Sequence, residues 1–200
     1  SAAPDVVSYN SSLAACNRAA ESHRALALWS DLLRSGLRPT SVSFGTAISA
    51  LAVGGRWAEA LALLTEARRR RTELTLIGHN AAIDACSKAA QWTQALELLA
   101  CLSRLGPRPG IVTYNSAISA CGRAERWPEA LLLLHQAARG PTGCNAVTVG
   151  AAIAAAAASG QWVWALALLQ EARQLGLQAN VVCFGAAVSA CERAARWAQA

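Results

Sequence analysis

Apolar residues recur along this chain at helical spacing, and polar or glycine-containing segments separate the stretches in which they do so. Within residues 111–125, for example, small and aliphatic side chains are spaced at i, i+3, i+4 and i+7 (Ala117, Ile118, Ala120, Cys121 and Ala124). A second stripe follows in residues 127–139, with Ala130, Leu131, Leu133 and Leu134. This spacing puts the apolar side chains on one face of an α-helix, so each pair of stripes predicts two helices joined by a turn.

The same helical pair repeats at a fixed interval. The segment VTYNSAISACGRAERW belongs to a series of similar strings that begin at residues 7, 42, 77, 112, 147 and 182, each 35 residues after the last. Complete repeats are predicted over residues 6–40, 41–75, 76–110, 111–145 and 146–180, with the tail of a preceding repeat in residues 1–5 and a truncated sixth in residues 181–200. Because one hairpin cannot bury both of its faces, we expect one continuous all-α domain, a superhelical α-solenoid of stacked helix-turn-helix repeats.

Composition agrees with a thin helical stack. The 200 residues are 54% hydrophobic but only 6% aromatic, and much of the apolar fraction is alanine, which permits close helix contacts. The most apolar stretch, residues 146–158, falls short of the roughly 20 residues that a membrane span needs, so no membrane segment is expected. No targeting peptide is visible, as expected of a chain that opens inside a repeat.

Seven cysteines raise the question of disulfides or metal. Four of them occupy one repeat position, at which the other repeats have Leu51 and Ala156, and are therefore expected to be small core residues (Cys16, Cys86, Cys121 and Cys191). The chain contains no C-x-x-C, and dispersed thiols in odd number favour a reducing compartment.

Tryptophans also recur at one repeat position, in the first turn of the second helix (Trp57, Trp92, Trp127, Trp162 and Trp197). A row of indoles could stack nucleobases. The second helices should form the outer layer, however, so we expect these side chains to pack between adjacent hairpins.

The repeated pattern V-x-Y-N-x-x-I-x-A-C-x-[RK]-A, followed by W-x-x-A-L-x-L-L and G-x-x-P, resembles the pentatricopeptide repeat family in its 35-residue P-type form. Tetratricopeptide repeats share the paired helices, but they have a period of 34 residues and lack the Tyr-Asn start. The resemblance implies an α-solenoid that binds single-stranded RNA at one base per repeat, in a mitochondrion or plastid, and serves RNA processing, stability or translation.

The family's RNA-binding positions can be located in these repeats. The second residue of each repeat would clamp a base between neighbouring repeats (Val7, Val42, Ile77, Val112, Val147 and Val182), although a β-branched residue that opens a helix could equally be a packing residue. The fifth and last residues would read the base edge, and those with side chains suited to this are Asn10, Thr40, Asn80, Asn115, Asn145 and Asn180.

The base-reading positions are only partly filled. Gly45, Gly150 and Gly185 stand at fifth positions and offer no side chain to a base, so the expected sequence specificity is weak. Asn115 with Asn145 is the one pair in which both residues carry an amide, and in the family such a pair resembles those that favour pyrimidines.

The positive charge suits an anionic partner. Lys and Arg number 18 against 12 Asp and Glu, a net charge of +6, and four of the cations recur at one position of the first helix (Arg18, Lys88, Arg123 and Arg193). They would form a ladder that follows a phosphate backbone, or else a solvated face that keeps the protein soluble. The run Arg68–Arg71 falls at the end of a second helix and is expected to be a helix-end charge cluster.

Catalysis finds no support in the sequence. His23, His79 and His135 fall at three different repeat positions without a carboxylate or cysteine at metal-ligand spacing, so we expect no enzyme, metal, cofactor or small-molecule substrate. Two classes of function stay open. One is a single-stranded RNA-binding module, and the other is a protein-interaction scaffold or a subunit of a larger assembly such as an organellar ribosome.

Overall fold

The computed structural model describes residues 5–141, 143–174 and 180–194, except for the side chain of Leu105. Within these ranges it contains eleven α-helices and no strand: α1 (Val6–Arg18), α2 (Ser22–Arg34), α3 (Ser41–Val53), α4 (Trp57–Arg69), α5 (Leu76–Lys88), α6 (Trp92–Leu105), α7 (Ile111–Arg123), α8 (Trp127–Arg139), α9 (Ala146–Ala158), α10 (Trp162–Gln174) and α11 (Val181–Arg193). The predicted all-α fold of helix-turn-helix repeats is confirmed. Residues 1–4 and 195–200, including Trp197, lie outside the described residues.

The odd-numbered helices begin at side-chain caps. The Thr40 hydroxyl accepts a hydrogen bond from the backbone N–H of Ser43 (3.3 Å), and the Thr40 N–H donates to the Ser43 hydroxyl (3.1 Å). Asn145 and Thr148 form the same reciprocal pair at the start of α9. Such capping boxes satisfy N–H groups that have no partner inside the helix, which fixes where the helix begins.

A residue in left-handed conformation reverses the chain between each odd-numbered helix and the helix that follows. The five residues at this point are spaced 35 apart: Ala20, Gly55, Ala90, Glu125 and Gly160, with φ of 57°, 71°, 54°, 57° and 69°. The next residue donates its N–H back to the end of the odd-numbered helix, as Arg126 does to the Cys121 carbonyl at 2.8 Å. This hydrogen bond closes a tight helical hairpin.

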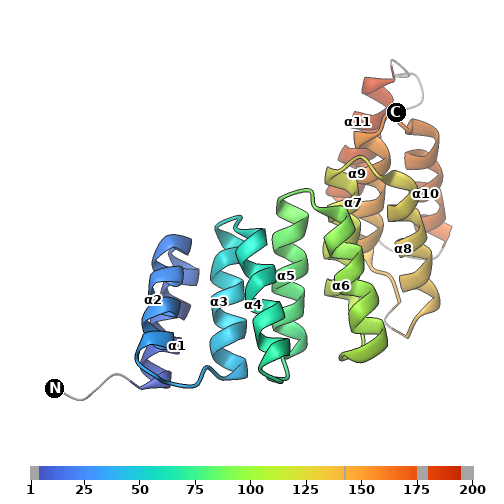
Figure 1. The fold of residues 1–200 in the computed structure, drawn as a ribbon. Helices are drawn as coiled ribbons and strands as arrows, with labels where there is room; N and C mark the ends of the chain where they lie inside the picture. The colour runs from blue at the N-terminus through green and yellow to red at the C-terminus, as the bar shows by residue number, and fades with distance from the viewer. Residues whose placement is uncertain (1–4, 142, 175–179, 195–200) are drawn as a thin grey trace. The chain divides into compact units, whose positions relative to one another are not determined.

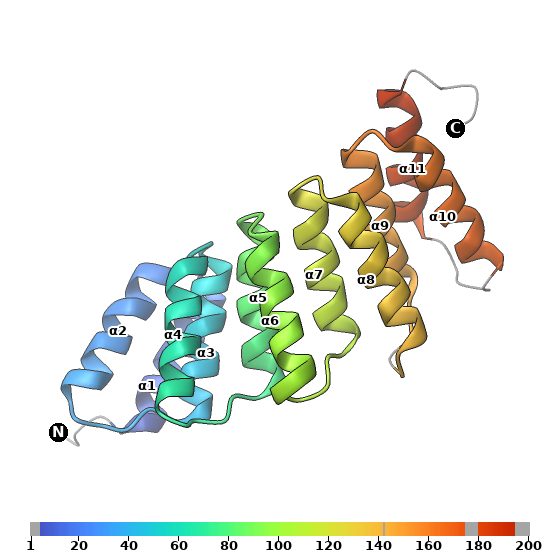
Figure 2. The same cartoon turned by 45° about the vertical axis from the view of Figure 1, so that its right-hand side comes forward.

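The chain divides within α6 into two compact units, Ser1–Ala89 with Ala100–Arg108 and Ala90–Leu99 with Pro109–Ala200. In the first unit, α1, α3 and α5 pack side by side, α2 packs against α1 and α3, and α4 packs against α3 and α5 (Figure 1). The second unit repeats this arrangement, with α7, α9 and α11 in one layer and α8 and α10 in the other (Figure 2). Each unit is thus a two-layer stack.

Side chains of one repeat donate to backbone carbonyls of the repeat before it. Lys88 Nζ lies 3.4 Å from the Ala52 carbonyl, and Arg193 Nη1 lies 3.4 Å from the Ala158 carbonyl, both at the C-terminal ends of odd-numbered helices. The Ser159 hydroxyl and the Cys183 thiol donate in the same direction, to the carbonyls of Glu125 (3.2 Å) and Ala146 (3.4 Å). These hydrogen bonds join neighbouring hairpins inside each unit.

The expected packing roles of cysteine and tryptophan are confirmed where the structure describes them. The four cysteines at the shared repeat position are between 0% and 7% exposed, and burial raises the pKa of Cys86 and Cys121 to about 11. Indoles contact adjacent hairpins: the Arg126 guanidinium lies 4.5 Å from the Trp92 ring centroid, and the Trp127 and Trp164 centroids are 5.7 Å apart. None of the helices in the described ranges combines the length and apolar character of a membrane span.

Candidate nucleic-acid interface

A branched aliphatic side chain is exposed in the first turn of every odd-numbered helix. These residues are the predicted clamps, and their exposed fractions are 67% for Val7, 62% for Val42, 73% for Ile77, 56% for Val112, 56% for Val147 and 65% for Val182. None of them packs into the core of its unit. Isolated exposed valines are ordinary on protein surfaces, but one at the same point of six successive repeats forms a regular apolar row.

Three residues further along each odd-numbered helix lies the fifth residue of the repeat. The side-chain oxygens of Asn10 and Asn115 are buried and have no hydrogen-bond partner. A buried carbonyl without a partner costs about 1–3 kcal/mol, so such atoms are rare in folded proteins. A nucleobase N–H would satisfy these oxygens, and Asn80, at the same position, is half-buried.

The fifth-position glycines differ in the space around them. A side chain at Gly45 would meet no atom within 4 Å, whereas a Cβ at Gly150 would lie 3.2 Å from Cys183 Sγ. Gly45 therefore leaves open room beside the apolar row, while Gly150 lets α9 and α11 approach each other closely.

The last residues of the repeats serve as helix caps, a role that the sequence analysis missed. Asn145 Oδ1 accepts from the Thr148 N–H and from the Thr148 hydroxyl, both at 2.9 Å, and Asn180 Oδ1 accepts from the Cys183 N–H at 3.1 Å. The signal was available, because a hydroxyl residue stands three positions after Thr40 and Asn145. With its oxygen engaged in capping, each of these asparagines keeps its amide nitrogen as the donor it can offer to a ligand.

The clamp, fifth-position and last-position residues therefore meet at the N-terminal ends of the odd-numbered helices. These ends carry the positive pole of the helix dipole, which favours an anionic ligand.

The predicted phosphate ladder lies at the other ends of these helices. Arg123 follows Val112 by eleven residues, which corresponds to about 16 Å along the helix axis. Arg18 and Arg123 are exposed and form no ion pair with any described residue, whereas Lys88 pairs with Asp84 at 2.9 Å. Since Lys88 and Arg193 also reach a carbonyl of the preceding helix, two of the four cations have a structural role.

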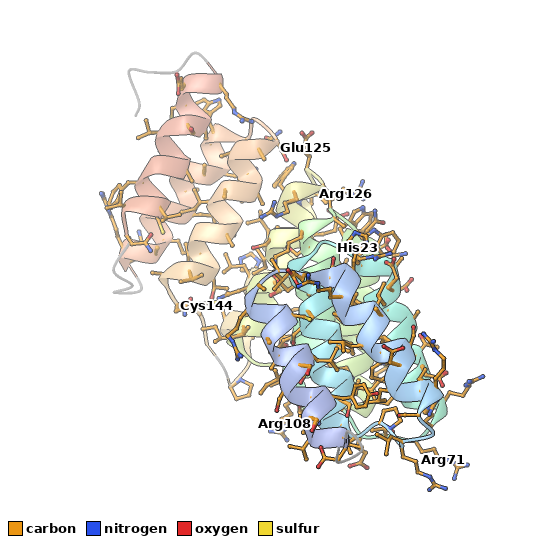
Figure 3. The ribbon with its side chains drawn as sticks, turned by 90° about the vertical axis from the view of Figure 1, so that its left-hand side faces the viewer. His23, Arg71, Arg108, Glu125, Arg126 and Cys144 are labelled. Atoms are coloured by element: carbon orange, nitrogen blue, oxygen red, sulfur yellow. The ribbon has the colours of Figure 1, made fainter. Side chains whose placement is uncertain are left out.

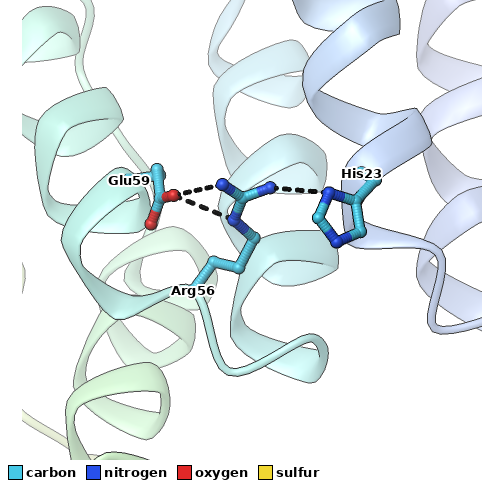
Figure 4. A network of polar contacts seen from close by, with 3 residues as sticks. All are labelled: His23, Arg56 and Glu59. Carbon is cyan, nitrogen blue, oxygen red and sulfur yellow. Dashed lines mark hydrogen bonds and ion pairs between the residues drawn. The ribbon is translucent and has the colours of Figure 1, made fainter.

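Other arginines are held at the hairpin turns. Arg56 donates to the Glu59 carboxylate (Nε at 2.8 Å), and its Nη1 lies 3.1 Å from His23 Nδ1 in the preceding repeat (Figure 4). The backbone N–H of Glu59, and after it the Arg56 guanidinium, hold the pKa of the Glu59 carboxyl below its ordinary value. Arg126, labelled in Figure 3, pairs with Glu129 in the same way at 2.6 Å. These guanidiniums already have partners and are poor candidates for phosphate contacts.

Nothing in the described ranges is arranged for metal binding, since no three His, Cys, Asp or Glu side chains gather there. His79 is 8% exposed, and its Nδ1 lies 3.1 Å from the Thr75 carbonyl. Burial lowers the pKa of His79, which keeps the ring neutral near pH 7.

Comparison with known proteins gives the following matches. The family model described as "PPR repeat" matches residues 42–71 and 112–138, and the model described as "Pentatricopeptide repeat domain" matches residues 62–124. No curated protein sequence matches the chain significantly.

Three solved structures are similar over almost the whole chain. The pentatricopeptide repeat protein PPR10 from maize is 28% identical with a TM-score of 0.75, over 98% of this chain and 28% of that one. PPR10 in complex with an 18-nt psaJ RNA element is 26% identical with a TM-score of 0.82, over 98% and 29%. The PPR domain of Arabidopsis thaliana protein-only RNase P 1 in complex with tRNA is 11% identical with a TM-score of 0.74, over 95% and 96%, which shows a shared fold. This chain thus spans less than a third of the PPR10 chains that it matches.

Proposed function

The chain is a pentatricopeptide repeat protein, and we propose that it binds single-stranded RNA along the N-terminal ends of its odd-numbered helices. The observation that carries this proposal is the exposed aliphatic row beside amide oxygens that are buried without a partner. The structures of PPR10 and of the RNase P domain in complex with RNA support it, because both share this fold.

In the proposed complex each base lies between the branched side chains of two successive repeats, at one base per repeat. The methyl groups cover the two faces of the base, and the fifth residue meets its edge. For the base between Val112 and Val147, Asn115 Oδ1 would accept a hydrogen bond and the Asn145 amide nitrogen would donate one. Cytosine and uracil each present one donor and one acceptor side by side, so this repeat should favour a pyrimidine.

Sequence preference outside that repeat is proposed to be weak, because three of the six fifth residues are glycine. Binding would then rest largely on shape and phosphate contacts, without catalysis. The resemblance to the family supports a role in RNA processing, stability or translation within a mitochondrion or plastid. Imaging of the tagged full-length protein would test the location.

The test compares two valines of equal exposure on different helices. Val112 in α7 is 56% exposed and Val163 in α10 is 57% exposed. Val112→Ala removes two methyl groups worth about 0.8 kcal/mol each when buried, so affinity for random single-stranded RNA should fall by up to roughly 15-fold. Val163→Ala should leave it unchanged. Fluorescence polarisation at two salt concentrations measures both the affinity and the number of phosphate contacts.

Equal affinity of the parent and of both variants, or an affinity without salt dependence, would contradict the proposed RNA interface. A second candidate function, protein binding, is favoured by exposed apolar side chains on the even-numbered helices: Leu132 (62%), Val163 (57%) and Trp164 (46%). At the position of Trp164 other repeats carry Glu59, Gln94 or Glu129. Should RNA fail to bind, this surface becomes the leading functional site.

A further inference from the structure

A cavity of about 730 Å³ lies in the first unit, at a corner formed by the end of α4, the start of α5 and the end of α6. Its lining includes Arg68, Arg71, Thr75, His79 and Cys101. This volume falls in the range of small-molecule sites, which is about 300–1,000 Å³. The clamp row and the cation ladder do not line it.

The arginine run that ends α4 supplies two free positive charges to this cavity. The two middle arginines pair with one carboxylate, Glu66, at 2.9 Å from Arg69 and 2.6 Å from Arg70. Among the described residues, neither Arg68 nor Arg71 forms an ion pair, and both line the cavity. Glu73 is the one acidic side chain in the lining, so the ionised groups there sum to one positive charge.

Two further groups in the cavity can act on a ligand. Cys101 is half-buried, and Arg68 Nη2 donates to its sulfur at 3.0 Å. His79 is 8% exposed and uses Nδ1 to contact the Thr75 carbonyl, so Nε2 is left without a hydrogen-bond partner among the described residues. A buried, neutral imidazole with a free Nε2 accepts a hydrogen bond from a ligand N–H. The cavity therefore joins a partly accessible sulfur, two free guanidiniums and one unused acceptor.

We propose that this cavity is a thiol-modification site, at which Cys101 forms a mixed disulfide with a small anionic disulfide of the peptide-thiol class. Carboxylates of such a molecule would pair with Arg68 and Arg71, and its amide N–H would donate to His79 Nε2. A cationic, partly exposed setting is the one in which cysteines react, because positive charge stabilises the attacking thiolate and attracts an anionic reagent. The site is independent of RNA binding.

The chemistry is a thiol–disulfide exchange. Cys101 gives its proton to solvent, and its sulfur attacks one sulfur of the incoming disulfide. A new S–S bond forms as the old one breaks, and the leaving thiolate takes the electron pair and a proton from water. Cys101 is oxidised, and one half of the incoming disulfide is reduced.

The chain contains its own control cysteine. Cys144, which Figure 3 places between α8 and α9, is also half-buried, but its thiol donates to the Leu134 carbonyl at 3.5 Å. Burial, and then the charge of Glu171, raise the pKa of Cys144. The other five cysteines are at most 7% exposed or wholly buried, so they also report whether the protein stays folded.

The experiment treats the 200-residue chain with oxidised glutathione and follows each cysteine by peptide mass spectrometry. We expect the adduct at Cys101 to form at least roughly tenfold faster than at Cys144. Arg68→Met should slow Cys101 by about tenfold, whereas Arg69→Met, which removes an arginine already paired with Glu66, should not. With bis(2-hydroxyethyl) disulfide, which is neutral, the effect of Arg68→Met should shrink.

Equal rates at Cys101 and Cys144 would overturn the proposal, as would an Arg68→Met rate equal to that of the parent or the absence of any adduct at Cys101. Modification of the five buried cysteines in a variant would show unfolding. In that event Arg68→Lys, which keeps the charge and should retain most of the rate, replaces the methionine variant in the same comparison.

Discussion

Replacing Asn115 with alanine should stabilise the free protein and weaken its binding to RNA. The buried Asn115 Oδ1 has no hydrogen-bond partner, so its removal recovers about 1–3 kcal/mol of desolvation cost. Alanine also favours the helix by up to roughly 0.7 kcal/mol, while the loss of side-chain packing offsets about 1 kcal/mol. The expected net gain in the free energy of unfolding is about 1–2 kcal/mol, a rise in Tm of about 2–8 °C for a chain of this size.

Asn145, the proposed partner of Asn115, supplies the control. Its side chain caps α9 through two hydrogen bonds of 2.9 Å, so Asn145→Ala should cost about 1 kcal/mol of stability. Both variants should bind an RNA with a pyrimidine opposite this repeat about 5–150-fold more weakly, the equivalent of a hydrogen bond worth about 1–3 kcal/mol. The two substitutions thus change stability in opposite directions and affinity in the same direction.

Thermal unfolding followed by circular dichroism, together with polarisation binding, measures both effects. A loss of stability in Asn115→Ala would show that this amide has a structural partner and refute the reasoning. A gain in stability with unchanged affinity and unchanged base preference would remove Asn115 from the RNA site.

Three further predictions concern turns, pH and base reading. Glu125→Gly relieves a left-handed residue and should stabilise by about 0.5–1 kcal/mol in urea unfolding, while Gly160→Ala, whose Cβ would meet no atom within 4 Å, should lose a similar amount through φ alone. Burial lowers the pKa of His79 from its ordinary 6.5, so the unfolded chain binds a proton that the folded chain does not, and stability should fall as pH drops below about 6.5; Tm measured against pH should lose this slope in His79→Phe. Gly45→Asn should be tolerated and add a base preference in a binding-site selection, whereas Gly150→Asn should lower Tm through its contact with Cys183, at a cost of about 1–3 kcal/mol.

Much of the fold could be predicted from the sequence, because the period and the apolar stripes both depend on local spacing. The stripe containing Ile118 and Cys121 is buried as its period requires, and both side chains are 0% exposed. The arrangement of the two units could not be predicted, since no repeat differs from its neighbours in a way that marks a division within α6. The left-handed turn residue was hidden for a different reason: alanine and glutamate stand at this point in three repeats, and neither is typical of that conformation.

The candidate site was predictable by position and less so by chemistry. A valine that opens a helix is apolar whether it is packed or exposed, so only the structure could show that Val112 is exposed. Asn145 illustrates the limit for polar groups, because its amide can cap a helix, read a base or do both, and the cap depends on hydrogen-bond geometry. Lys88 belongs to a regular series of cations, yet its contact with the Ala52 carbonyl arises from the spacing between repeats.

The hydrogen bonds between repeats give the array a direction. In each of the four described, a side chain of the later repeat donates to a carbonyl of the earlier one. Deleting repeats from the C-terminal side would therefore strip donors from carbonyls at the end of the newly terminal helix, where the helix dipole is negative. Deletion from the N-terminal side would release only lysine, arginine, serine or cysteine side chains into water. Hydrogen exchange should consequently show fraying that propagates more readily from the C-terminal end of a shortened array than from its N-terminal end.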